Sequence, residues 1–174
     1  MADVVEIPAG VLDAIVAHAQ AERPNECCGL LIGSALTIHE SVPARNLALS
    51  PTSYLIDPAD HFAAIRVARR SGRQVVGAYH SHPESPPTPS GRDLAEASFP
   101  EFVYLIVSLA EPDKNDAVRA YRLTDGNTVA SVSVNQYVKG NTTPICPGGG
   151  TYTYNIIGTR PTCDIQSPTS HLLP

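Results

Sequence analysis

The chain has 174 residues, of which 43% are hydrophobic and 17% are charged, and this length and composition suit one globular domain. Twelve Lys and Arg residues against 17 Asp and Glu residues leave a formal charge of -5, so the broad attraction to phosphate on which nucleic-acid binders rely is missing. The longest apolar stretch, Phe102 to Leu109, is far shorter than the roughly 20 residues that a transmembrane helix requires. Composition therefore predicts a globular protein that neither binds nucleic acid nor spans a membrane.

The amino-terminal residues and the cysteines favour a cytoplasmic protein. Acidic residues such as Asp3 stand where a secretory signal would need a basic start and an apolar core. Cys27 and Cys28 are neighbours that could bridge each other only with strain, and Cys146 and Cys163 lie in a segment of biased composition. We therefore expect free thiols, with Cys28 small and buried and Cys27 more exposed.

The first third of the chain predicts a helix followed by a hairpin. Apolar residues at spacings of three and four, after a proline, predict an amphipathic helix over about residues 8–21. Two short apolar runs, 28–33 and 36–38, predict a pair of strands joined by a turn at Gly33 and Ser34. The helix needs a sheet to pack against, and these strands begin one.

A second helix is predicted over about residues 58–71. Asp57 supplies a capping acid before a proline in the first turn, and Gly72 ends an apolar run that includes Phe62. A Pro-rich loop and a short helix from Ser90 separate the first of the later strands from the second. Those strands are expected over 74–81, 102–109, 118–123 and 128–134. The order of the elements predicts an α/β fold, a mixed β-sheet flanked by helices.

The composition changes after Tyr137. From 139 to 174, 19 of 36 residues are Gly, Pro, Ser or Thr and only three are charged, so this stretch cannot bury a core of its own. We therefore expect one domain over residues 1–138 and a flexible tail over residues 139–174.

The residues with the clearest chemistry follow the strand that begins at residue 74. Side chains alternate across a strand, so His80 and His82 lie on one face with Cβ atoms roughly 7 Å apart. From that separation two imidazoles can converge on one cation. Pro83 ends the strand, and three further prolines stiffen the chain that follows.

Three more polar residues complete a catalytic arrangement. Ser90 can cap a helix whose first turn presents Asp93 as a third, anionic ligand, and two histidines, one carboxylate and an open position describe a catalytic zinc site. The attacking water needs a base, and Glu26, at the start of an earlier strand, is the candidate. Ser90 is also placed to donate a hydrogen bond to the oxyanion that develops on the attacked carbonyl.

The same residues resemble the motif of the JAMM or MPN-plus zinc metallopeptidases, which is an upstream Glu followed by His-x-His, seven residues, Ser, two residues and Asp. Glu26, His80, His82, Ser90 and Asp93 match every position. The resemblance implies a single JAMM/MPN domain of the cytidine-deaminase-like type with one Zn²⁺ per chain. It further implies that His80, His82 and Asp93 bind the metal, that Glu26 is the general acid and base, and that Ser90 stabilises the tetrahedral intermediate.

Within this family the chain is similar to the short bacterial stand-alone type, such as the CysO-cysteine peptidases, through residues 24–33, 50–54 and 79–83. The resemblance covers about residues 4–138. It implies hydrolysis after the C-terminal glycine of a ubiquitin-like β-grasp sulfur carrier, for example with release of cysteine. Two alternatives stay open: an isopeptidase that acts on protein conjugates, like a deubiquitinase, and a non-catalytic MPN scaffold that binds partners. The oligomeric state is also open.

Several of these features have simpler explanations. Ser90 and Asp93 have the spacing of a helix capping box, a role that can coexist with metal binding. The arginines near the end of the 58–71 helix fit a solvated basic face, although that face could guide an acidic carrier. His82 and Glu84 imitate the His-x-Glu of zinc deaminases, but the sequence lacks the paired cysteines that those enzymes need downstream.

Overall fold

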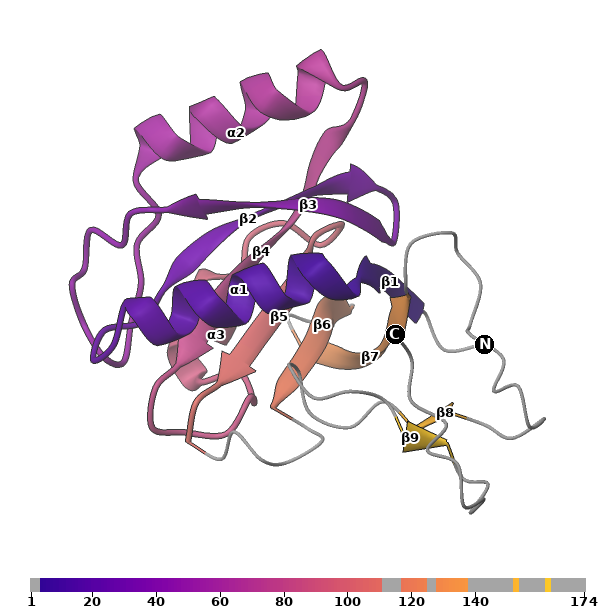
Figure 1. Cartoon of the computed structure of the whole chain (residues 1–174). Coiled ribbons are helices and arrows are strands. Elements are labelled where there is room, and N and C mark those ends of the chain that lie inside the picture. The colour runs from indigo at the N-terminus through magenta and orange to yellow at the C-terminus, as the bar shows by residue number, and fades with distance from the viewer. Residues whose placement is uncertain (1–3, 111–116, 125–127, 138–151, 154–161, 164–174) are drawn as a thin grey trace.

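The computed structural model describes residues 4–110, 117–124, 128–137, 152–153 and 162–163 (Figure 1). The helices in these parts are α1 Ala9–Ala21, α2 Pro58–Arg70 and α3 Gly91–Glu96. The strands are β1 Val4–Pro8, β2 Cys28–Ser34, β3 Thr37–Ala44, β4 Gln74–His82, β5 Val103–Ser108, β6 Val118–Thr124, β7 Thr128–Tyr137, β8 Tyr152–Thr153 and β9 Thr162–Cys163. None of the helices in the described residues is long and apolar enough to cross a membrane.

Strands β1 to β7 form one mixed sheet that closes into a barrel in the order β1-β3-β2-β4-β5-β6-β7. β2 is antiparallel to both β3 and β4, and β4 is parallel to β5. β1 closes the barrel by pairing in parallel with β7 and β3. The predicted mixed sheet with flanking helices is confirmed. The closure of the sheet was not predicted, because the strand that closes it, β1, was not predicted. β1 has only five residues and ends at Pro8, the residue expected to begin the first helix.

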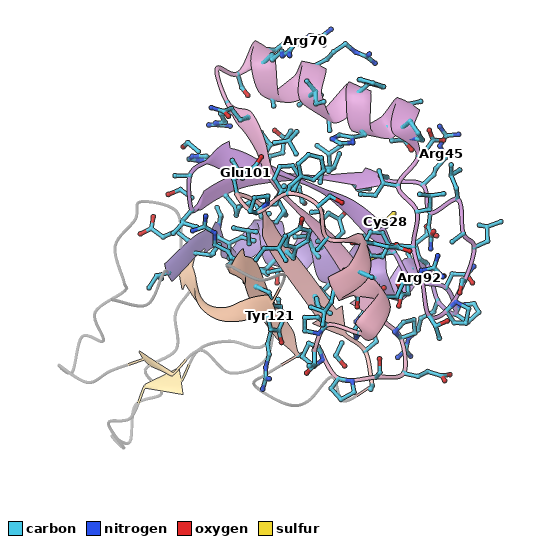
Figure 2. All side chains as sticks on the ribbon, turned by 180° about the vertical axis from the view of Figure 1, so that it is seen from behind. Cys28, Arg45, Arg70, Arg92, Glu101 and Tyr121 are labelled. Atoms are coloured by element: carbon cyan, nitrogen blue, oxygen red, sulfur yellow. The ribbon has the colours of Figure 1, made fainter. Side chains whose placement is uncertain are left out.

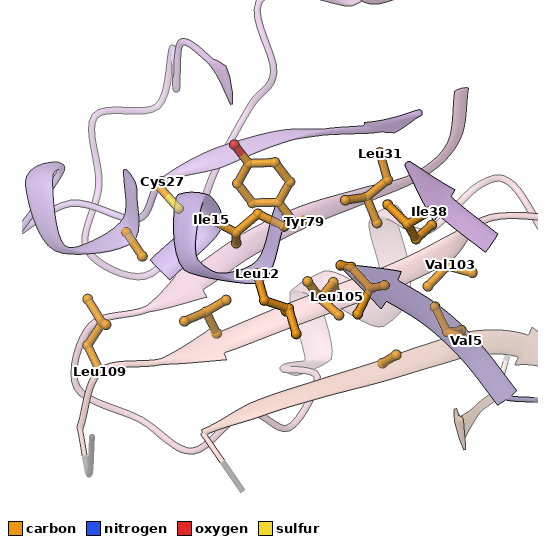
Figure 3. Packing of buried hydrophobic residues seen from close by; sticks show 14 residues of the cluster. Val5, Leu12, Ile15, Cys27, Leu31, Ile38, Tyr79, Val103, Leu105 and Leu109 are labelled. Carbon is orange, nitrogen blue, oxygen red and sulfur yellow. The ribbon is translucent and has the colours of Figure 1, made fainter. Parts of the chain in front are cut away.

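The main core lies between α1 and the sheet. Leu12 and Ile15 of α1 are fully buried against side chains that β2, β4 and β5 direct to the same face, including Leu31, Tyr79 and Leu105 (Figure 3). The apolar face of the predicted amphipathic helix is therefore the face that is buried. The helix begins one residue later than expected.

Helix α2 covers the opposite face of β2 and β4, where Ala64 packs with Leu30 and Ala78 (Figure 1). Its cap is as predicted, because an Asp57 carboxylate oxygen accepts a hydrogen bond from the Ala59 amide at 2.7 Å. Phe62, expected in the apolar run, is instead 63% exposed. The buried positions of the helix are Ala64 and Ala68, whose small side chains let the helix approach the sheet closely.

The β2–β3 turn lies two residues later than predicted. The chain turns at Ala35 and Leu36, with Ala35 in the left-handed region at φ 50°. Gly33 belongs to β2, where an added Cβ would clash with the carbonyl oxygen of Thr37. This glycine is therefore required by close packing of the two strands rather than by a turn.

The proposed division into a domain of residues 1–138 and a tail of residues 139–174 stays a prediction. Of the tail, the structure describes only the antiparallel pair of β8 and β9. The rest of the expected tail, with Cys146, lies outside the described residues.

Candidate active site

The last residues of β4 carry the two histidines of the candidate site. His80 and His82 lie on one face of the strand, and their Nε2 atoms are 3.1 Å apart. Both side chains are buried, with 2% and 4% of their surface exposed. Strand alternation thus brings the two imidazoles together at the end of β4, as the spacing predicts.

Asp93 reaches the histidines from the first turn of α3. Its Oδ1 lies 3.4 Å from Nε2 of His80, and its Oδ2 lies 3.4 Å from Nε2 of His82. Oδ2 also accepts a hydrogen bond from the Ser90 amide at 2.7 Å, while Ser90 Oγ accepts one from the Asp93 amide at 3.2 Å. This is a reciprocal capping box, so one carboxylate both caps α3 and faces the histidines.

The Pro-rich segment between His82 and Ser90 is tied down by side chains from several elements. Ser108 Oγ donates to the Ser85 carbonyl at 2.7 Å, and the Tyr121 hydroxyl donates to the Pro87 carbonyl at 2.6 Å. His82 Nδ1 lies 2.7 Å from the Pro86 carbonyl, which can only accept, so this nitrogen carries the proton. The hydrogen bond therefore directs the unprotonated Nε2 of neutral His82 toward Asp93 and His80.

The three donor groups fit a metal ion. One atom each of His80, His82 and Asp93 lies within 4.8 Å of the others. Metal–ligand bonds of about 2.0–2.1 Å at tetrahedral angles would place neighbouring donor atoms about 3.3 Å apart. The separation of 3.1 Å between the two Nε2 atoms agrees with that spacing, and each of these atoms has one Asp93 oxygen at 3.4 Å. Two imidazoles and one carboxylate form a donor set that catalytic sites use when a further position stays open.

The protonation states of Asp93 and His80 also suit a cation. Burial alone would raise the pKa of Asp93, but its contacts with His80 and His82 outweigh that effect and hold the pKa far below its ordinary value. Burial lowers the pKa of His80. Burial alone would also lower the pKa of His82, but its contacts with Asp93 and the Pro86 carbonyl raise it. At neutral pH the site therefore holds an ionised carboxylate and a neutral His80.

Glu26 lies beside the histidines because of strand register. Cys28 pairs with His80, and the Ser81 amide donates to the Cys27 carbonyl at 3.2 Å, so Glu26 precedes β2 at the level of His82. Its side chain is only 4% exposed, and its Oε2 has no hydrogen-bond partner among the described residues. Burial raises the pKa of Glu26 to about 7. A carboxyl group with that pKa can take up and release a proton at neutral pH.

Tyr54 contacts the site in a way that the motif does not predict. Its ring stacks on His80, with centroids 4.5 Å apart and an angle of 24° between the planes. Burial raises the pKa of Tyr54, so its hydroxyl stays protonated. The sequence signal was only its place in segment 50–54, which resembles the bacterial family type, because nothing local shows that this loop folds over a strand 26 residues later.

Arg23 is a second residue that sequence reasoning missed. Its Nη2 donates to the Leu109 carbonyl at 2.6 Å and to the Pro83 carbonyl at 3.3 Å. The guanidinium thereby joins the segment that leads to Glu26 to the ends of β4 and β5. Carbonyl oxygens of distant residues leave no trace in the local sequence, so this contact could not be foreseen.

The two adjacent cysteines are free and buried. The expectation for Cys28 is confirmed, but Cys27 is 1% exposed and the prediction of a more exposed thiol is wrong. Its side chain belongs to the main core, while its amide donates to Ser81 Oγ at 2.8 Å. Burial raises the pKa of each thiol to about 12, so neither is a thiolate nucleophile at neutral pH.

Residues 8–124 match the family described as Prok-JAB, prokaryotic homologs of the JAB domain. The chain is 36% identical over 130 residues to a Thermus thermophilus protein named probable TtuB-protein conjugate cleaving protease, covering 74% of this chain and 82% of that protein. It is 33% identical over 125 residues to the CysO-cysteine peptidase of Mycobacterium tuberculosis, covering 71% and 85%. It is 38% identical over 111 residues to a desampylase of Haloferax volcanii, covering 60% and 80%.

Solved structures agree with these matches. The solution structure of a protein from Desulfitobacterium hafniense shares 30% identity with this chain at a TM-score of 0.71, covering 78% of this chain and 94% of that one. A protein from Salinibacter ruber shares 27% identity at a TM-score of 0.57, covering 81% and 95%. Because the family match spans well over half of the residues, the chain belongs to the prokaryotic homologs of the JAB domain, and its resemblance to the JAMM or MPN-plus proteins is confirmed.

Proposed function

We propose that this chain is a zinc-dependent metallopeptidase that hydrolyses the peptide or isopeptide bond after the C-terminal glycine of a ubiquitin-like protein. The observation that carries the proposal is the convergence of His80, His82 and Asp93 beside Glu26, whose pKa lies near neutrality. His80, His82 and Asp93 are the residues that would hold one Zn²⁺. When bound, such an ion supplies Lewis acidity toward the scissile carbonyl and lowers the pKa of a coordinated water.

Glu26 is assigned the proton transfers. In its ionised form the carboxylate accepts a proton from the attacking water, and the resulting carboxylic acid then delivers that proton to the leaving amine. Both steps need a group that changes charge near the working pH, and the pKa of Glu26 of about 7 meets that condition. Its Oε2, which accepts no hydrogen bond from the residues that the structure describes, leaves one oxygen available for the water.

Ser90 is assigned the role of stabilising the oxyanion that develops on the scissile carbonyl. Its Oγ accepts a hydrogen bond from the Asp93 amide, so the hydroxyl proton is not used by the cap. The side chain is exposed at the start of α3, next to Asp93. A hydroxyl whose position is set by a helix cap can donate to a carbonyl oxygen as negative charge builds up on it.

The names of the relatives support the substrate class. One is a peptidase for a CysO–cysteine adduct, and another is a probable protease for TtuB–protein conjugates. We propose that this chain likewise takes an extended C-terminal diglycine, with either a small adduct or a protein attached through an amide. The cytoplasmic location expected from the sequence stays a prediction.

The proposal is tested by measuring zinc and hydrolysis on the same samples. Wild-type protein is expected to contain about one zinc per chain and to release cysteine from a CysO–cysteine adduct, and His80→Ala with His82→Ala is expected to lose both. A lysine-linked protein conjugate of the same carrier, assayed in parallel, distinguishes small-adduct from isopeptide cleavage. Zinc-free wild type that reloads with zinc and still cleaves neither substrate would favour the non-catalytic scaffold.

A further inference from the structure

The loop between β3 and α2, residues 45–57, exposes an unusual amount of apolar surface. Leu47, Leu49 and Leu55 are 50%, 75% and 59% exposed, and they are half of the large hydrophobic side chains that are exposed in the described residues. Leu47 and Leu55 lie side by side, because the Leu47 amide donates to the Leu55 carbonyl at 2.8 Å. Single exposed leucines need no explanation, but three on one short loop indicate a contact surface. We call these three residues the leucine surface.

Asn46 holds this loop in one conformation. Its side-chain oxygen accepts from the amides of Ala48 and Leu55, each at 2.9 Å. Its side-chain nitrogen donates to the carbonyls of Glu26 at 3.0 Å and Ser53 at 3.1 Å. All four hydrogen-bonding positions of this buried amide are therefore used. The leucine surface is thus preorganised, which lowers the ordering cost of binding a partner.

The same loop contacts the candidate active site at two points. The Glu26 amide donates to the Ser50 carbonyl at 2.9 Å, and the Glu26 carbonyl accepts from Asn46. Loop residues therefore hydrogen-bond both backbone groups of Glu26. Tyr54 of the loop stacks on His80. Any partner bound to the leucine surface is therefore held next to the reacting groups. Figure 2 shows Arg45, at the start of the loop, on the same side of the molecule as Cys28 and Arg92.

A groove adjoins the leucine surface. Its apolar lining comes from Pro43, Ala44, Leu47 and Leu49, and its polar lining includes His18 and Glu22 of α1 together with Arg45 and Asp60. Arg45 is oriented by ion pairs with Asp57 at 2.8 Å and Asp60 at 3.0 Å. An apolar centre combined with charged groups is the composition of a protein-binding surface.

We propose that the leucine surface and this groove dock an apolar patch on the folded body of the ubiquitin-like substrate, while the substrate tail enters the site at His80 and His82. The inference rests on the proposed function. The extended tail of the substrate spans at most about 3.3–3.6 Å per residue. When its diglycine lies at the site, the folded body of the substrate is therefore only a few residues' length away from His80 and His82. The leucine surface meets this requirement because its loop contacts Glu26 and His80. Contacts made there would contribute binding energy at a distance from the scissile bond.

The test compares two substrates that share one C-terminus: the full-length CysO–cysteine adduct and a hexapeptide with the same final residues. In Leu47→Ser with Leu49→Ser, kcat/KM on the folded adduct is expected to fall about tenfold or more through KM. The hexapeptide is expected to be cleaved within about twofold of the wild-type rate. Phe62→Ser, a control at an equally exposed side chain on α2, is expected to leave both substrates unaffected.

Each other result overturns the docking proposal in a recognisable way. An equal loss on both substrates would show that the loop acts on catalysis, and no loss on either would show that the surface is not used. A wild-type dimer that becomes monomeric in the leucine variant, with KM for the adduct unchanged, would assign the surface to a second copy. If the wild type cleaves neither substrate, the proposed function fails. Docking can then still be tested by calorimetry, which compares the binding of CysO to Glu26→Gln with its binding to the same variant carrying the leucine substitutions. Equal affinities would overturn the docking proposal.

Discussion

The two faces of β4 bury side chains of opposite character. On one face Tyr79 is fully buried among the apolar residues that contact α1. On the other face Ala78 packs against α2. Further along the same face, at the end of β4, His80 and His82 are buried next to Asp93. Apolar groups are stable when removed from water, whereas buried polar groups require partners. One face of the strand therefore supplies stability and the other supplies the candidate chemistry.

Glu26→Gln gives the sharpest change on the site face. The substitution keeps the shape of the side chain but removes the group assigned to proton transfer, so hydrolysis is expected to fall roughly 10²- to 10⁴-fold. Zinc content is expected to stay near wild type, since Glu26 is not among the three metal-binding candidates, and the variant is expected to keep the fold. The measurements are kcat on a CysO–cysteine adduct, metal analysis and thermal unfolding. Retained turnover would remove Glu26 from the mechanism.

Leu12→Ala is the corresponding change on the core face. Leu12 is fully buried between α1 and the sheet, and its truncation leaves a cavity that is expected to lower the free energy of unfolding by about 2–5 kcal/mol. Denaturant unfolding measures the loss. Zinc content and kcat of the folded fraction are expected to be unchanged, and a fall in kcat at full folding would mean that the two faces are coupled.

The pH dependence of the metal-free protein separates the faces further. The pKa of Glu26 is about 7 in the folded chain against an ordinary 4.5, so between these values the folded state holds a proton that the unfolded state has released. The contribution of Glu26 to stability is then largest below about pH 4.5 and falls by about 3 kcal/mol as pH rises through 7. Glu26→Gln is expected to remove this slope, which urea unfolding at several pH values measures, while Leu12→Ala keeps it.

Tyr79→Phe is the mildest test. The Tyr79 hydroxyl lies 3.0 Å from His18 Nδ1, and its removal is expected to lower the free energy of unfolding by about 1 kcal/mol. Although Tyr79 precedes His80, it points to the core face, so zinc content and kcat/KM are expected to stay within about twofold of wild type. A large loss of zinc in this variant would contradict the separation of the two faces.

Local sequence patterns predicted most elements because their causes are local. The cap at Asp57 and the alternation of His80 and His82 depend on residues within one turn or one strand, and both occur as expected. The β2–β3 turn was misplaced because Gly33 is explained by an interstrand contact rather than by local backbone needs. The burial of Cys27 depended likewise on which face of the strand meets α1.

The sequence by itself determined the helical and strand periodicities, the candidate donor set and the spacing that puts two imidazoles on one face. Only the tertiary structure decided that the sheet closes through β1, that Tyr54 stacks on His80, and that Asn46 bonds to the Glu26 backbone. Periodicity reports what a residue's near neighbours require. Contacts between residues far apart in the chain depend on strand register and loop path, which are set when the whole core is buried together.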